Sequence, residues 1–347
     1  MKGRGSSMKL TRKDIAKEAG VSPSTVSRAL TGSPLIPPET TAKIRELAGR
    51  MGYKPNALAK QLAFNRSFQL GFVLPLNLKL AHKSPLRMSY YSNILNGMVG
   101  TAFERGYRVC LHPYAGEGKD AGDALAEAVE KRNVDGLVLL GLSQRSRIPA
   151  SLIESNAPFV LIGSRQKGAS SVNCNPLPAL KAFISRIAEL GYERLIHVQG
   201  DSRYYDAATQ NASLKAAAKG SRFESFETMP GDYSKTSGHN AAEELFARRR
   251  RFEAKTCVFL ACDRMAMGFY NYCHERGIGI PTDVGVFGSD GDELASALHP
   301  KLASMIQPRE SMGSLAASIL MDICEGKRHD AQDEMLEGTP EFGDSLN

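Results

Sequence analysis

Short apolar runs alternate with longer helical stretches from residue 69 onward, and this alternation constrains the fold more than any other feature of the chain. Strands that alternate with helices of about ten or more residues form parallel sheets. The runs are apolar throughout rather than at every second position, which is typical of sheets covered on both faces. The runs are residues 70–74, 107–111, 134–140, 159–162, 195–198, 257–260 and 284–287.

A segment without either periodicity, residues 163–175, separates these runs into two series. We therefore predict an α/β region made of two doubly wound lobes. In open sheets of this kind, ligands bind beyond the carboxyl ends of the strands. The pattern thus predicts a ligand cleft between the two lobes.

The first 66 residues carry a positive charge that the rest of the chain lacks. The chain of 347 residues has a formal net charge of +7. Residues 1–66 hold thirteen Lys and Arg against four Asp and Glu, a net +9, which leaves −2 on the other 281 residues. Cations that neutralise phosphates release counterions, so this basic head favours nucleic-acid binding. Charge alone equally allows a solvated basic face without a partner.

Local signals in the basic head predict a helix-turn-helix. Thr11 and Asp14 form a capping-box variant that begins a helix, and Gly20 ends it. Ser22 caps the next helix, and Pro23 suits its first position because that amide has no helical partner. A short helix, a turn holding Gly and a second helix with a polar face are the helix-turn-helix plan.

A third helix follows Pro37-Pro38 and ends at Gly52, so the head is predicted to be a small all-α unit. Its expected core consists of Ile15, Val26, Leu30, Ile44 and Leu47. Arg28, on the polar face of the second helix, could donate two hydrogen bonds to a guanine edge, worth about 1–3 kcal/mol of discrimination. A phosphate contact or a cation at the helix end is the alternative role for Arg28.

The order and spacing of these features resemble one known family. The runs KDIAKEAGVSPSTVSRALTGS at 13–33 and TAKIRELAGRMGYKPNALAKQL at 41–62 resemble the head of the LacI/GalR transcriptional regulators. The resemblance implies a hinge helix at 55–62 that orders on operator DNA, with Leu62 wedged into a minor-groove step. Lys60 stands where the family often has Arg. The predicted DNA contacts are Ser22, Pro23, Ser24, Thr25, Ser27, Arg28, Tyr53, Asn56, Ala59, Lys60 and Leu62.

The resemblance continues more loosely beyond the head, in four short segments. They are KRNVDGL at 131–137, ACDRMAMG at 261–268, IPTDVGVFGSD at 280–290 and LASMIQP at 302–308. The family fold that they imply is a dimeric, periplasmic-binding-protein-like core. We accordingly predict a DNA-binding domain at 9–54, a hinge and linker at 55–68, and an effector-binding core at 69–347. Within the core, we assign about 69–168 and 304–330 to the first lobe and about 169–303 and 331–347 to the second.

The resemblance also indicates which side chains bind the effector. Gln210 stands where the family usually has an arginine, and Arg165 could replace that missing cation. The predicted effector contacts are Tyr91, Arg165, Gln210, Asp263 and Asp290. A helix cap at Asp263 and a core position for Tyr91 are the alternatives. Because residues 299–313 look most like the gluconate-responsive members, we expect a sugar or sugar acid, with gluconate as the specific candidate.

Other functions lack their sequence signals. No apolar stretch is long enough to span a membrane, the first ten residues lack the apolar run of a secretory signal, and the six cysteines form no CxxC pair. No catalytic set is present, so we expect no enzyme activity, no cofactor and no metal. The prediction is a cytoplasmic homodimeric repressor on a pseudo-palindromic operator. A solute-binding protein of a transport system and a sugar enzyme are the alternatives.

Overall fold

The computed structural model describes residues 10–31, 35–53, 61, 64–75, 89–221, 223–247 and 252–347. The chain divides into two units, Met1–Ser67 and Phe68–Asn347, which we call the head and the core. The division falls one residue before the predicted start of the core. The predicted hinge helix lies outside the described residues except for Gln61.

Three helices make up the described part of the head, α1 (Arg12–Ala19), α2 (Pro23–Thr31) and α3 (Pro38–Arg50). Local caps fix the start and end of α1 and the start of α2, as predicted. The backbone and side chain of Thr11 donate to the Asp14 carboxylate at 2.8 and 2.7 Å, and Gly20 ends α1 with a positive φ of 67°. Ser22 Oγ accepts the backbone N–H of Thr25 at 3.0 Å, which caps α2.

The head has a small apolar core where the three helices meet. Ile15, Val26, Ile44 and Leu47 are buried there as predicted, whereas Leu30 is only partly buried. Ala16, Ala29 and Ala48 complete the buried set. With so few buried side chains, each one carries a large share of the stability of the head.

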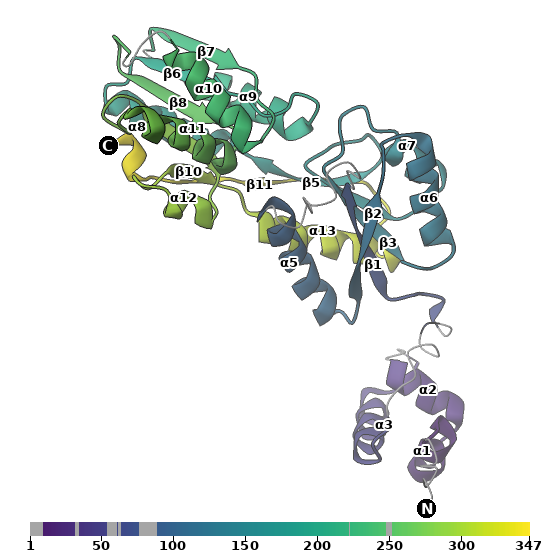
Figure 1. Ribbon diagram of the computed structural model, residues 1–347. Helices are drawn as coiled ribbons and strands as arrows, with labels where there is room; N and C mark the ends of the chain where they lie inside the picture. The colour runs from purple at the N-terminus through teal and green to yellow at the C-terminus, as the bar shows by residue number, and fades with distance from the viewer. Residues whose placement is uncertain are drawn as a thin grey trace, which may run out of the picture. The chain divides into compact units, whose positions relative to one another are not determined.

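The first sheet of the core has six parallel strands in the order β11-β5-β4-β3-β1-β2. Helices α5 and α13 lie side by side on one of its faces, and α6 and α7 cover the other (Figure 1). The strands are β1 (Gln69–Pro75), β2 (Arg108–Tyr114), β3 (Gly136–Leu140), β4 (Phe159–Ile162), β5 (Ser170–Asn175) and β11 (Asp333–Glu337), and the helices are α5 (Ser89–Glu104), α6 (Lys119–Glu130), α7 (Ile148–Glu154) and α13 (Arg309–Cys324).

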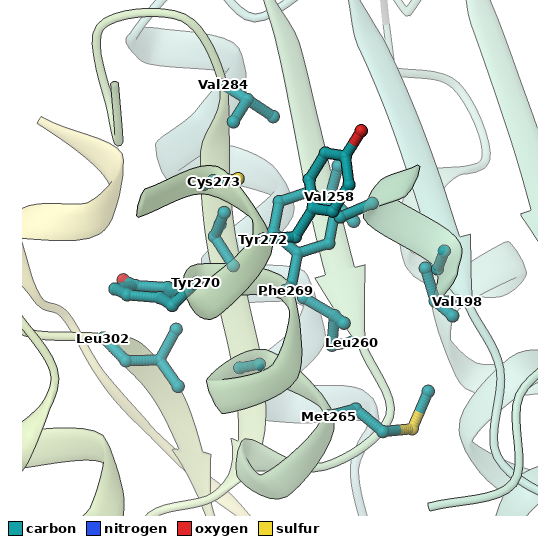
Figure 2. Close-up of a cluster of buried hydrophobic side chains, with 14 of the residues drawn as sticks. Val198, Val258, Leu260, Met265, Phe269, Tyr270, Tyr272, Cys273, Val284 and Leu302 are labelled. Carbon is teal, nitrogen blue, oxygen red and sulfur yellow. The ribbon is translucent and has the colours of Figure 1, made fainter. Parts of the chain in front are cut away.

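The second sheet has six strands in the order β12-β10-β9-β8-β6-β7, all parallel except β12. Helices α10 and α11 cover one face, and Figure 2 shows the apolar side chains that α11 packs on that face. Helices α8 and α9 cover the other. The strands are β6 (Arg194–Val198), β7 (Ser225–Met229), β8 (Thr256–Leu260), β9 (Gly285–Asp290), β10 (Ala303–Ile306) and β12 (Thr339–Glu341), and the helices are α8 (Leu177–Glu189), α9 (Tyr205–Ala218), α10 (Lys235–Phe246), α11 (Asp263–Arg276), α12 (Glu293–Ala297) and the 3-10 turn η3 (Asp344–Leu346).

The two doubly wound lobes confirm the predicted fold class, but the predicted lobe limits are wrong. The chain passes between the sheets after β5, after β10 and after β11. Strand β5 lies inside the segment 163–175 that we interpreted as a separator, and it belongs to the first sheet. Strand β10 belongs to the second sheet and β11 to the first, the reverse of their predicted assignments.

Buried polar side chains explain why β5 escaped the apolar pattern. Ser170, Ser171 and Asn173 are all buried in this strand. Ser171 donates to Asp333 on β11 at 2.6 Å, and Asn173 donates to Ser171 at 2.9 Å. A polar side chain is tolerated inside a protein when it is hydrogen-bonded, so this strand needs no apolar residues at these positions.

Candidate DNA-binding surface and effector cavity

The outer face of α2 presents short polar side chains and one guanidinium to solvent. Ser22, Pro23, Ser24 and Arg28 are exposed. Thr25 is half-buried, and its hydroxyl lies 2.8 Å from that of Ser22. A helix with this face is suited to the major groove, where short polar groups and Arg contact base edges.

Two other predicted DNA contacts have roles within the head. Ser27 is half-buried, and its hydroxyl accepts a hydrogen bond from Arg12 on α1 at 3.0 Å. Tyr53 is half-buried against the apolar core of the head. The remaining predicted contacts, which are Asn56, Ala59, Lys60 and Leu62, lie outside the described residues.

A cavity of about 340 Å³ opens between the two lobes of the core. Residues that directly follow or end β3, β4, β8, β9 and β10 line it, so it lies at the carboxyl ends of both sheets, as predicted for the cleft. The lining residues are Ser89, Tyr90, Tyr91, Gly141, Gly163, Cys174, Pro176, Tyr204, Asp206, Thr209, Gln210, Tyr233, Ala261, Cys262, Arg264, Asp290, Asp292, Leu294, Met305 and Gln307.

Tyrosines form the aromatic part of the cavity wall. The rings of Tyr90 and Tyr91, at the start of α5, meet edge to face with centroids 5.3 Å apart. The chain approaches both rings closely at Gly141 and Gly163, which have φ of +67°. A Cβ at either position would lie within 2.4 and 2.5 Å of a tyrosine oxygen, so only glycine fits.

A buried ion pair crosses between the lobes beside this wall. Asp290, at the end of β9, pairs with Arg309, at the start of α13. Arg309 is only 3% exposed, and its guanidinium lies 5.2 Å from the centroid of the Tyr90 ring. Ser89 from the first lobe also donates to Asp292 in the second. These contacts connect the cavity lining directly to the relative position of the lobes.

Asp206, in the first turn of α9, is a carboxylate of the cavity that forms no ion pair with the described residues. Burial raises its pKa to about 6, while the hydrogen bond from Tyr90 and the more distant Arg309 act in the opposite direction. Burial also raises the pKa of Tyr90, so its hydroxyl stays protonated and donates to Asp206 at 3.3 Å. Burial likewise raises the pKa of Asp290, against the effect of Arg309.

The cavity brings together three of the five predicted effector residues, namely Tyr91, Gln210 and Asp290. Arg165 and Asp263 do not line it, which corrects the prediction for these two positions. Arg165 is 44% exposed at its side chain and pairs with Asp333 at 2.5 Å. Asp263 is fully buried and accepts from Ser304 at 2.7 Å and from the backbone of Gly291 at 2.9 Å, so it supports the loop after β9.

Sequence reasoning missed several lining residues. Tyr204 and Asp206 lie where the chain leaves β6 and enters α9, at the carboxyl end of a strand, and that position was the available signal. Arg309 carried no signal, because its burial depends on contacts between separate segments. No group of His, Cys, Asp and Glu within the described ranges could hold a metal ion.

The fold and the two sites define a class, a DNA-binding helix-turn-helix head joined to a two-lobed ligand-binding core. The family model described as "Bacterial regulatory proteins, lacI family" matches residues 11–56, and the model described as "Periplasmic binding protein-like domain" matches residues 184–346. With the two matches in this order, the chain is similar to LacI-family transcriptional regulators in its head and to periplasmic-binding-protein-like domains in its core.

Transcriptional regulators are similar to this chain along nearly its whole length. The ribose operon repressor of Escherichia coli (strain K12) is 28% identical over 322 residues, which cover 90% of this chain and 92% of the relative. The structure of a transcriptional regulator CelR–cellobiose complex is similar with a TM-score of 0.71 and 25% identity, over 97% of this chain and 99% of that chain.

The lac repressor dimer bound to operator and the anti-inducer ONPF shares the fold, with a TM-score of 0.74 and 21% identity over 97% of this chain and 99% of that chain. The helices in the described part of the chain fall short of the length and hydropathy that a membrane span needs.

Proposed function

We propose that this regulator is a repressor that binds a pseudo-palindromic operator as a homodimer and responds to a small polyhydroxylated effector. The observation that carries the proposal is the presence, on one chain, of an exposed polar recognition helix and of a polar, tyrosine-lined cavity between two lobes. Because the cavity lining crosses between lobes, an effector changes lobe closure and, through the predicted hinge, operator affinity. A coupling of about 1–3 kcal/mol corresponds to a change of roughly 5- to 150-fold.

Basic side chains of the head supply the sequence-independent part of operator affinity. We expect the logarithm of the association constant to fall linearly with the logarithm of salt concentration, because phosphate contacts release counterions. The test is fluorescence anisotropy of labelled operator in a salt series. A dependence that stays flat would contradict the phosphate contacts.

Base contacts from Arg28 and a minor-groove wedge from Leu62 supply the sequence-specific part of operator affinity. Leu62→Ala should weaken operator binding much more than binding to random DNA, since only the operator is kinked at its centre. Equal losses on both DNAs would reject the wedge. Arg28→Ala should relax specificity at one base pair, whereas a phosphate contact would weaken all sequences alike.

An exposed apolar strip on α5 supports self-association. Val99 and Phe103, one turn apart on this helix, are 46% and 80% exposed. Large apolar side chains that stay exposed in one copy are typical of protein interfaces. Sedimentation velocity should show a dimer for the native chain and a shift toward monomer for Phe103→Asp, with weaker operator binding.

The effector is expected to be a sugar. Two similar proteins support this class: one is named as a ribose operon repressor, and the structure of the other is a complex with cellobiose. The sequence-based candidate, gluconate, would pair its carboxylate with Arg264, the cationic side chain that lines the cavity. The carboxylates of Asp206, Asp290 and Asp292 in the same wall disfavour an anion.

Titration calorimetry with ribose, cellobiose, glucose and gluconate, followed by operator binding with each ligand, tests this proposal. A ligand that binds the core and changes operator affinity identifies the effector and the direction of its effect. A solute-binding protein of a transport system is not favoured, because the LacI model matches residues 11–56.

A further inference from the structure

The carboxylates of the effector cavity are not equally neutralised. Asp290 pairs with the buried Arg309. Asp292 accepts from Ser89 and from the backbone of Leu294 at 2.9 Å, where it caps α12. Among the described residues, Asp206 has no ion pair, and its one hydrogen-bonded side chain is Tyr90 at 3.3 Å.

Counting charges around the cavity leaves an excess of one negative charge. Three carboxylates line it, against one guanidinium in the lining, Arg264, and a second on α13, Arg309, which pairs with the lining residue Asp290. Since Arg309 is held by Asp290, neither Asp206 nor Asp292 has an ion pair among the described residues. Asp292 accepts two hydrogen bonds and Asp206 only one, so Asp206 is the carboxylate with the most unused acceptor capacity. The first turn of α9 favours a negative charge at this position, so the carboxylate can remain ionised until a ligand arrives.

The thiol and the phenols of the wall add no further negative charge. Burial raises the pKa of Cys174 to about 12, which keeps this thiol neutral. Tyr91, Tyr204 and Tyr233 are also held protonated, because burial raises the pKa of each. The faces of tyrosine rings attract cations, so the lining next to Asp206 suits a positive group better than a negative one.

We propose that the effector carries a protonated amine, and that Asp206 is the residue that selects it over the corresponding neutral sugar. An ammonium has three donors and no acceptor, whereas a hydroxyl offers one donor. A charge-assisted hydrogen bond to a desolvated carboxylate is about twice as strong as a neutral one. The inference rests on the proposed function of the cavity as the effector site.

Matched pairs of sugars test the amine directly. Titration calorimetry of the full chain at pH 7.5 would compare D-glucosamine with D-glucose, D-galactosamine with D-galactose, and D-mannosamine with D-mannose. We expect at least one amine to bind about tenfold or more tightly than its neutral partner, and to change operator affinity. An amine preference of this size corresponds to about 1.4 kcal/mol.

Two variants assign the preference to one carboxylate. Asp206→Asn should remove the amine preference while the neutral partner changes less than about threefold. Asp201→Asn is the matched control, since Asp201 lies in the loop that leads into α9, outside the cavity lining, and pairs with Arg203 at 2.6 Å. The control should retain the preference.

The outcomes separate the two proposals. If a neutral sugar or gluconate binds as tightly as any amine and changes operator affinity, the cavity is an effector site but the amine inference is wrong. If the preference survives Asp206→Asn, Asp206 is not the selecting residue. If none of the tested sugars binds, both the sugar effector and the amine inference fail.

Discussion

The head and the core place their functional polar groups in opposite environments. In the head, Ser24 and Arg28 are exposed to water on the outside of α2, and the buried side chains of α1, α2 and α3 are apolar. In the core, Asp206 and Asp290 line a cavity between the lobes, and the buried Arg309 pairs with Asp290. Function in the head therefore costs little stability, because exposed charges keep their hydration, whereas function in the core is built from groups whose burial is costly.

A charge placed in the small core of the head should have the largest effect. Val26 is fully buried there, and Val26→Asp is expected to destabilise the head by about 5 kcal/mol or more, which exceeds what so small a unit can tolerate. Operator affinity should fall at least about 100-fold. The measurement is operator binding by fluorescence anisotropy.

The same variant tests whether the two units are energetically separate. Tyr53 is the single tyrosine of residues 1–67, while ten tyrosines belong to the core, so near-ultraviolet circular dichroism reports mainly on the core. The core transition should keep its melting temperature in Val26→Asp. A parallel loss of both units would show that the core depends on the folded head. Val26→Ala is the milder control.

Breaking the ion pair between the lobes should have the next largest effect. Arg309→Met leaves Asp290 buried without its cation, and a loss of about 3–5 kcal/mol in the free energy of unfolding is expected. Arg105→Met is the matched control, because Arg105 pairs with Asp322 and Glu325 at 2.8 and 2.7 Å with 26% of its side chain exposed. These partly exposed ion pairs should contribute about 1 kcal/mol or less. Equal losses of unfolding free energy in the two variants would contradict the difference between the buried and the partly exposed pairs.

Local chemistry made the head the more predictable unit. Thr11 with Asp14, Gly20, and Ser22 with Pro23 act over three or four residues, so their caps are visible in the sequence and are present in the structure. The two lobes of the core were also predictable, because apolar runs mark strands that are covered on both faces.

Distant contacts set the limit of prediction in the core. Strand β5 is polar because Ser171 finds Asp333, 162 residues further along the chain. The hydrogen bond between Tyr90 and Asp206 joins residues 116 positions apart. No local pattern encodes such pairs, so the lobe limits, Asp206 and Arg309 were missed, while Arg165 and Asp263 were assigned to a cavity that they do not line.

Removing the unpaired carboxylate should stabilise the core. The pKa of Asp206 is about 6 in the folded chain and 3.8 as a reference value, so the folded state loses stability as pH rises from about 4 through 6. Asp206→Asn should therefore raise the free energy of unfolding by about 1–3 kcal/mol at pH 7.5 and by almost nothing below pH 4. Urea denaturation at both pH values, with Asp201→Asn as the control, measures the gain. A gain that persists at pH 4 would rule out the charge as its cause.

The smallest expected effect belongs to a cap in the head that also lies on the recognition surface. Ser22→Ala removes the acceptor for the Thr25 N–H and should lower the stability of the head by about 1 kcal/mol without DNA present. Ser24→Ala is the matched control on the same turn, because the Ser24 hydroxyl contacts Ser22 at 2.6 Å but caps no backbone group in the described hydrogen bonds. Far-ultraviolet circular dichroism of the two variants separates these roles. If Ser22→Ala leaves the stability of the head unchanged, Ser22 acts only at the DNA surface. In that case the buried side chains of the head stabilise it, and the exposed side chains of the recognition surface serve DNA binding alone.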